Sequence, residues 1–150
     1  MTRILLNINR GRLLAISIGI IYVWFGLLKF FPELSPADGL AKHTITFLTF
    51  GLLPESISIL LLAIIEVGIG LCLLLNFQLK TVISIAIIHL ILTFIPVLFF
   101  PEVSFAKAPF VLTLVGQYIV KNIVIISALF FIYPIDDCAK NISLNKPLKL

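Results

Sequence analysis

The sequence predicts an all-α, polytopic membrane protein, a four-transmembrane-helix bundle with a short interfacial helix between the first and second spans. Of the 150 residues, 61% are hydrophobic and 12% are charged, whereas soluble domains average roughly 45–50% and about 25%. The apolar residues also gather into four runs, each near the roughly 20 residues that a helix needs to cross about 30 Å of hydrocarbon. We therefore expect residues 1–150 to form a single integral membrane domain in the lipid bilayer.

The four predicted spans cover about residues 13–31, 57–75, 81–100 and 109–133. Arginines precede the first span, as in a signal peptide, but its apolar run is longer than a signal h-region and no A-x-A cleavage site follows. We therefore interpret it as an uncleaved helix. Proline lacks an N–H and has a fixed φ, so it is predicted to end the third span at Pro101, to open the fourth at Pro109 and to end it at Pro134.

The segment 32–55 is too polar to cross the membrane and too apolar to be a free loop. Its residues Ser35, Pro36 and Asp38 resemble a helix start, with a hydroxyl at the N-cap, proline at N1 and an acid at N3. Side chains at helical spacing follow, namely Leu40, Thr44, Phe47 and Leu48. This pattern predicts a short helix in the membrane interface, and a re-entrant segment is the alternative.

The net charge of +4 comes from few, scattered basic residues beside apolar runs. We interpret these basic residues as signals that set the orientation of the spans in the membrane, and we expect no nucleic-acid partner. On the side of the termini the sequence has seven, namely Arg3, Arg10, Arg12, Lys80, Lys140, Lys146 and Lys149, and on the other side two, namely Lys42 and Lys107. Because Lys and Arg accumulate in cytoplasmic loops, both termini are expected in the cytoplasm.

The two cysteines, Cys72 and Cys138, form no C-x-x-C pair and lie far apart in the sequence. This spacing supports neither a disulfide framework nor a thioredoxin-like exchange site. We expect both to be free thiols.

Several ionisable or polar residues interrupt the predicted spans: Lys29, Glu66, His89, Gln117, Lys121 and Asn122. A charge at the bilayer centre costs several kcal/mol, so such residues normally face the bundle interior and pair with one another. At 1.5 Å per residue, Glu66 lies about 15 Å and Lys121 about 18 Å below the outer boundary, which predicts an ion pair between them. Lys29 lies only a few ångströms deep, and His89 arrives near the midplane.

The helical period predicts that these residues share an interior with small ones that let helices approach closely. The predicted inward faces are Gly19, Tyr22, Gly26 and Lys29; Ala63, Glu66 and Gly70; Ala86, His89, Thr93 and Pro96; and Thr113, Gln117, Lys121 and Ala128.

The polar cluster has a structural and a functional interpretation. A Glu–Lys pair can simply fix helix register, with the other groups as hydrogen-bond partners. Alternatively, Glu66, His89 and Lys121 line a pocket for a polar or redox-active small molecule, or relay protons. No second His or Cys stands at ligand spacing from His89, so no metal site is predicted. The ligand or proton-relay candidates are Glu66, His89, Lys121, Gln117, Asn122, Tyr22, Trp24 and Lys29.

Four stretches taken together resemble a known family: Tyr22–Phe30, Glu66–Gly70, Thr93–Glu102 and Gly116–Asn122. In this order and spacing they are similar to the DoxX-like superfamily of four-helix bacterial membrane proteins, particularly the reactive-chlorine-resistance YkgB-type branch. The resemblance implies a four-helix fold in the bacterial cytoplasmic (inner) membrane and a link to redox or oxidative-stress functions. Its founding members are similar to small membrane subunits of thiosulfate:quinone oxidoreductase.

The family's motif residues correspond by position to Trp24 and Lys29 in the first span, Glu66 in the second, and Lys121 and Asn122 in the fourth. The paired cysteines of thiol-oxidising relatives are missing here, which argues against a disulfide-based mechanism. The leading hypothesis is a membrane subunit or accessory of a redox or oxidative-stress system that holds a quinone-like molecule. It would work with a membrane or soluble redox partner protein and, if enzymatic, as a quinone-linked oxidoreductase subunit. The alternatives are a structural anchor or assembly subunit, and a small transporter or proton conduit.

Overall fold

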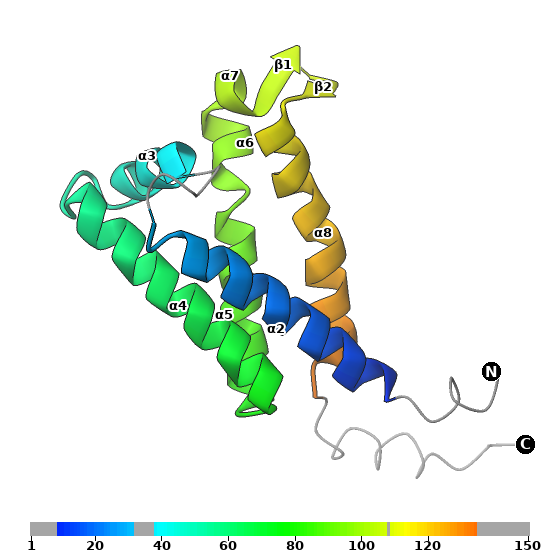
Figure 1. Ribbon diagram of the computed structural model, residues 1–150. Helices are drawn as coiled ribbons and strands as arrows, with labels where there is room; N and C mark the ends of the chain where they lie inside the picture. The colour runs from blue at the N-terminus through cyan, green and yellow to red at the C-terminus, as the bar shows by residue number, and fades with distance from the viewer. Residues whose placement is uncertain (1–8, 32–37, 108, 135–150) are drawn as a thin grey trace, which may run out of the picture.

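The protein is described by a computed structural model that covers residues 9–31, 38–107 and 109–134. Its longer helices are α2 (Arg10–Leu28), α3 (Asp38–Leu48), α4 (Glu55–Leu75), α5 (Leu79–Leu92) and α8 (Leu114–Ile132). Shorter elements join the last two, namely α6 (Ile95–Phe99), α7 (Pro101–Ser104), β1 (Phe105–Lys107) and β2 (Val111–Leu112). Figure 1 shows α2 and α4 side by side, with α8 along the opposite side of the bundle from α4.

Four helical segments are long and apolar enough to cross a membrane: Arg10–Leu28, Glu55–Leu75, Leu79–Phe99 and Leu114–Ile132. This result confirms the mostly helical, four-helix part of the predicted fold. The third segment ends just before Pro101 and the fourth just before Pro134, as the prolines predict.

The predicted start of the last span at Pro109 is wrong, because α8 begins at Leu114. Thr113 is its N-cap, and the Thr113 hydroxyl accepts a hydrogen bond from the Gly116 N–H at 3.1 Å. The residues just before it are already used, since β2 pairs with β1 in an antiparallel hairpin. A hydroxyl that satisfies an unpaired helical N–H is a stronger start signal than a proline several residues upstream.

The third span is interrupted, which the sequence analysis did not predict. Helix α5 ends at Leu92, and α6 begins at Ile95 with Pro96 in its first turn. Proline cannot donate the hydrogen bond that would continue the helix, so the break falls just before it. The Pro96 carbonyl accepts from the Phe100 N–H at 2.9 Å and also from the buried Ser104 hydroxyl at 3.2 Å, which fastens the following turn to the break.

Helices α2 and α4 run antiparallel and meet backbone to backbone at glycines. A methyl group placed on Gly70 would lie 2.7 Å from the Val23 nitrogen and 2.8 Å from the Gly19 carbonyl oxygen. One placed on Gly26 would lie 2.9 Å from the Val67 nitrogen. No side chain fits in this space, so these glycines set the distance between the two helices.

An arginine closes one end of the same helix pair. From the first turn of α2, Arg12 donates to the Leu73 carbonyl at 2.9 Å and also to the Leu74 carbonyl. These two carbonyls lie in the last turn of α4, where a helix leaves its acceptors without internal partners. The contact anchors the start of α2 to the end of α4.

Helix α3 confirms a helical segment between the first two spans. It lies above the other end of α4 in Figure 1. The Phe47 ring packs against Phe99 and Phe100, with centroids 5.1 and 5.8 Å apart. The predicted start at Ser35 and Pro36 lies outside the described residues.

Candidate functional site

The centre of the candidate site is an ion pair between α2 and α4. Lys29 is the C-cap of α2, and its ammonium donates to the Glu66 carboxylate at 2.6 Å. The two side chains are only 11% and 9% exposed. The close glycine contact at Gly26, one turn before Lys29, brings the two helices near enough for this pair.

The other carboxylate oxygen of Glu66 faces α5. His89 Nε2 lies 3.3 Å from Glu66 Oε1, and the histidine side chain is 14% exposed. His89 Nδ1 in turn lies 3.2 Å from the Tyr22 hydroxyl, which also lies 3.3 Å from the Ala86 carbonyl oxygen. Lys29, Glu66, His89 and Tyr22 therefore form one continuous arrangement, which we call the buried polar network.

Two proton arrangements satisfy this network. With a neutral imidazole, Nε2–H donates to the Glu66 carboxylate and Nδ1 accepts from the Tyr22 hydroxyl. With an imidazolium, both ring nitrogens donate, and the Tyr22 hydroxyl accepts from Nδ1 and donates to the Ala86 carbonyl. Because a hydroxyl rotates freely and both accepts and donates, His89 can gain or lose a proton without leaving a buried group unpaired.

The predicted ion pair between Glu66 and Lys121 is wrong. The Lys121 side chain is exposed, and its ammonium lies 5.5 Å from the centroid of the Tyr118 ring on its own helix. The error came from treating all four helices as level with one another. Glu66 lies eleven residues into α4, about 16 Å along the axis, and the end of α2 reaches this depth, so Lys29 arrives level with the acid.

The other sequence candidates lie outside the buried polar network. Gln117 is exposed on α8, and Trp24 is 65% exposed on the outer face of α2. Asn122 instead donates to the Thr93 hydroxyl at 3.0 Å and ties α8 to the break in the third span. The predicted inward faces are thus buried at Gly19, Tyr22 and Gly26, at Ala63, Glu66 and Gly70, and at Ala86 and Pro96. The predicted face of α8 is instead turned outward at Gln117 and Lys121.

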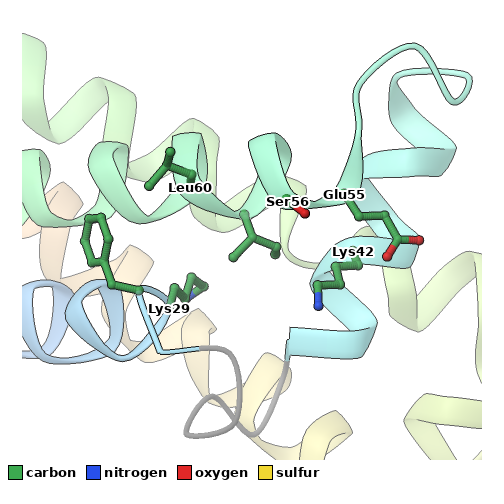
Figure 2. A pocket seen from close by; sticks show the side chains of 7 residues that line it. Lys29, Lys42, Glu55, Ser56 and Leu60 are labelled. Atoms are coloured by element: carbon green, nitrogen blue, oxygen red, sulfur yellow. The ribbon is translucent and has the colours of Figure 1, made fainter.

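A pocket of about 270 Å³ adjoins the network (Figure 2). It lies where the end of α2, helix α3 and the start of α4 come together. Its polar lining consists of Lys29, Lys42, Glu55 and Ser56, and its apolar lining consists of Phe30, Ile59 and Leu60. Lys29 belongs to both structures, because it lines the pocket and also donates to Glu66.

Three of the pocket residues, Lys42, Glu55 and Ser56, were not predicted from the sequence as site residues. Lys42 was interpreted only as a topology signal, Glu55 as the end of the segment 32–55, and Ser56 lies between that segment and the predicted second span. The available signal was the amphipathic pattern of 38–48, since a helix there must lay its apolar face on the neighbouring span and bring its polar residues to the span's end.

The described residues contain no group of three His, Cys, Asp or Glu side chains that could hold a metal ion. Cys72 is a free, half-buried thiol, and Cys138 lies outside the described residues. Comparison with protein-family models, curated proteins and solved structures found no match. The interpretation of the site therefore depends on its own chemistry.

Proposed function

We propose that this protein is a DoxX-like accessory or subunit of a redox or oxidative-stress system in the bacterial cytoplasmic membrane. In this proposal it binds the head group of a quinone-like molecule in the pocket and exchanges protons with it through the buried polar network. One observation carries the proposal: Lys29 lines the pocket and also belongs to the network. Electrons would come from a partner redox protein.

Membrane insertion is supported by the four long apolar helices. The outward-facing side chains of α2 and α4 are large and apolar, for example Leu27, Ile64 and Ile65, each about half exposed. Such a surface requires lipid or protein around it. The excess of Lys and Arg on the side of the termini supports an orientation with both termini in the cytoplasm.

The pocket has the mixed chemistry that a quinone head group needs. A ring with carbonyl oxygens accepts hydrogen bonds, which Lys29 and Ser56 are equipped to donate, while Phe30 and Leu60 offer apolar surface for the ring. Ligand pockets usually measure about 300–1,000 Å³. A cavity of about 270 Å³ suits a single substituted ring whose apolar tail extends into lipid.

The network supplies the protons that quinone reduction consumes. A proton given up by Lys29 to a reduced oxygen in the pocket is replaced through Glu66, which contacts Lys29 and His89 with its two oxygens. His89 is the natural store, because hydrogen-bond partners are in place for both of its proton states. This exchange requires only short transfers between groups already in contact.

Binding of decylubiquinone to the purified protein in detergent tests this proposal, measured by equilibrium dialysis against protein-free micelles. Lys29→Met and Leu60→Trp, which fills the pocket without touching the network, should each weaken binding at least about tenfold, equivalent to about 1.4 kcal/mol. Lys121→Met is the matched control and should bind like the parent. Equal binding by all three variants would refute the pocket assignment.

A second variant separates a functional network from a structural one. His89→Leu removes a polar group that the Lys29–Glu66 pair does not need, so the protein should stay folded by circular dichroism. We expect it to retain decylubiquinone but to lose the cellular oxidant-resistance phenotype. Unchanged resistance would favour an assembly role for the network, and an unfolded variant would show that His89 is structural.

A further inference from the structure

Helix α8 is the least covered of the four long helices. Of its most apolar 18-residue stretch, only 17% is buried inside the protein, compared with 39% for the same length of α4. In Figure 1 it lies along one side of the bundle, away from α4. Its packing within the described residues is mainly against α2, α5 and α7.

One stripe of exposed residues runs along α8 and consists of Leu114, Gln117, Lys121, Val124 and Phe131, which we call the outer stripe; α8 is also exposed beside it, at Tyr118, Ile123 and Phe130. Their positions alternate at intervals of three and four residues, with half-buried Ala128 completing the series. Residues at this spacing line one side of a helix and form the seam, that is, the line of contact along which a second helix packs. Leu114, Val124 and Phe131 are 65%, 71% and 73% exposed, so nothing in the described structure occupies the seam.

The middle of this stripe is charged. Lys121 is the eighth residue of α8, about 10 Å from the helix start along the axis, and it is exposed. Its ammonium lies over the Tyr118 ring, and no carboxylate within the described ranges pairs with it. Gln117, one turn earlier, likewise has no side-chain hydrogen bond there. A lysine and an amide facing hydrocarbon are costly unless a partner satisfies them.

The charge decides between two kinds of partner. In a second copy of this protein docked through the same stripe, both chains would insert in the same direction and Lys121 would face Lys121. Like charges in a medium of low dielectric constant repel strongly. Glu66 offers no acid for the partner's lysine, because it is buried and already bound by Lys29 and His89. The stripe is therefore complementary to a different helix, one that carries an acid.

We propose that the outer stripe of α8 docks a transmembrane helix of a partner membrane protein that presents an Asp or Glu at the depth of Lys121. Leu114, Val124 and Phe131 supply the apolar seam, and Gln117 and Lys121 fix its register, as a polar residue in a helix–helix seam does. This inference rests on the membrane insertion proposed above, but it does not depend on the pocket ligand.

Site-specific photo-crosslinking in the source cells tests the inference. A diazirine amino acid replaces Val124, and the matched control carries it at Ile64, which is 53% exposed on α4. We expect the Val124 probe, and not the Ile64 probe, to crosslink a membrane-spanning peptide with an Asp or Glu within one helical turn of the contact. Lys121→Met should reduce the yield at least fivefold, whereas Lys121→Arg should preserve it.

Exchange of the charges completes the experiment. Lys121→Glu should abolish the crosslink, and changing the partner's acid to lysine should restore it. Adducts with lipid only, with the α8 peptide of a second copy, or with a helix lacking an acid at that depth would each overturn the inference. Loss of the protein from carbonate-washed membranes would refute both this inference and the proposed membrane function, whereas lipid-only adducts would refute the inference alone.

Discussion

The ion pair between Lys29 and Glu66 should be energetically coupled, and its strength can be worked from the structure. The two charged groups are 2.6 Å apart, and their side chains are only 11% and 9% exposed. Removing one partner of a pair buried this deeply costs about 3–5 kcal/mol, because the other charge loses its compensation. His89 remains 3.3 Å from Glu66 and partly replaces the lysine, so we expect Lys29→Met to cost about 2–3 kcal/mol.

Glu66→Gln should cost a similar amount, because Lys29 loses its acceptor and His89 loses an anionic partner. The double variant leaves no unpaired charge, so its loss should be smaller than the sum of the two single losses by at least about 1 kcal/mol. Free energies of unfolding are measured in mixed micelles by titration with sodium dodecyl sulfate, with circular dichroism as the probe.

The matched control is Lys121→Met, which removes the other lysine of the predicted spans. Lys121 is exposed and has no carboxylate partner within the described residues, so the change should alter the free energy of unfolding by less than about 0.5 kcal/mol in micelles. Additive losses for Lys29→Met and Glu66→Gln would refute the coupling. A loss for Lys121→Met as large as that for Lys29→Met would refute the assignment of the partner.

Three further predictions concern packing, capping and topology. Gly70→Ala should lower the free energy of unfolding by about 1–3 kcal/mol, because its methyl group would meet the backbone of α2. Gly68→Ala has open space around it and should cause no loss in the same titration, because alanine favours the helix by up to about 1 kcal/mol over glycine. Arg12→Met should cost about 1–2 kcal/mol because two carbonyls of α4 lose their donor, and thermal unfolding should show no such loss for the exposed Arg10→Met. A cysteine placed at Lys42 should react with an impermeant maleimide in intact cells, whereas one in the C-terminal tail should not; the reverse pattern would overturn the orientation.

The long helices could be predicted because their signal is summed over many residues. An apolar run near 20 residues identifies a span whatever it packs against, and the period of α4 correctly placed Ala63, Glu66 and Gly70 on its buried face. Local contacts were harder. The turn that Ser104 fastens to Pro96 and the start of α8 at Thr113 each depend on a single hydrogen bond that composition does not encode.

The network shows why the partner of Glu66 could not be found by depth alone. Counting residues from each end of a span assumes that all spans begin at one level, yet Lys29 at the end of α2 meets Glu66 well inside α4. What brings them level is the oblique contact at Gly26 and Gly70, and a sequence read one helix at a time does not contain that contact. The lysine left over, Lys121, then faces outward. The two residues predicted to pair therefore belong to separate features. Glu66 lies in the buried polar network with Lys29 and His89, whereas Lys121 is a charge on the surface of the bundle that requires a partner outside the described residues.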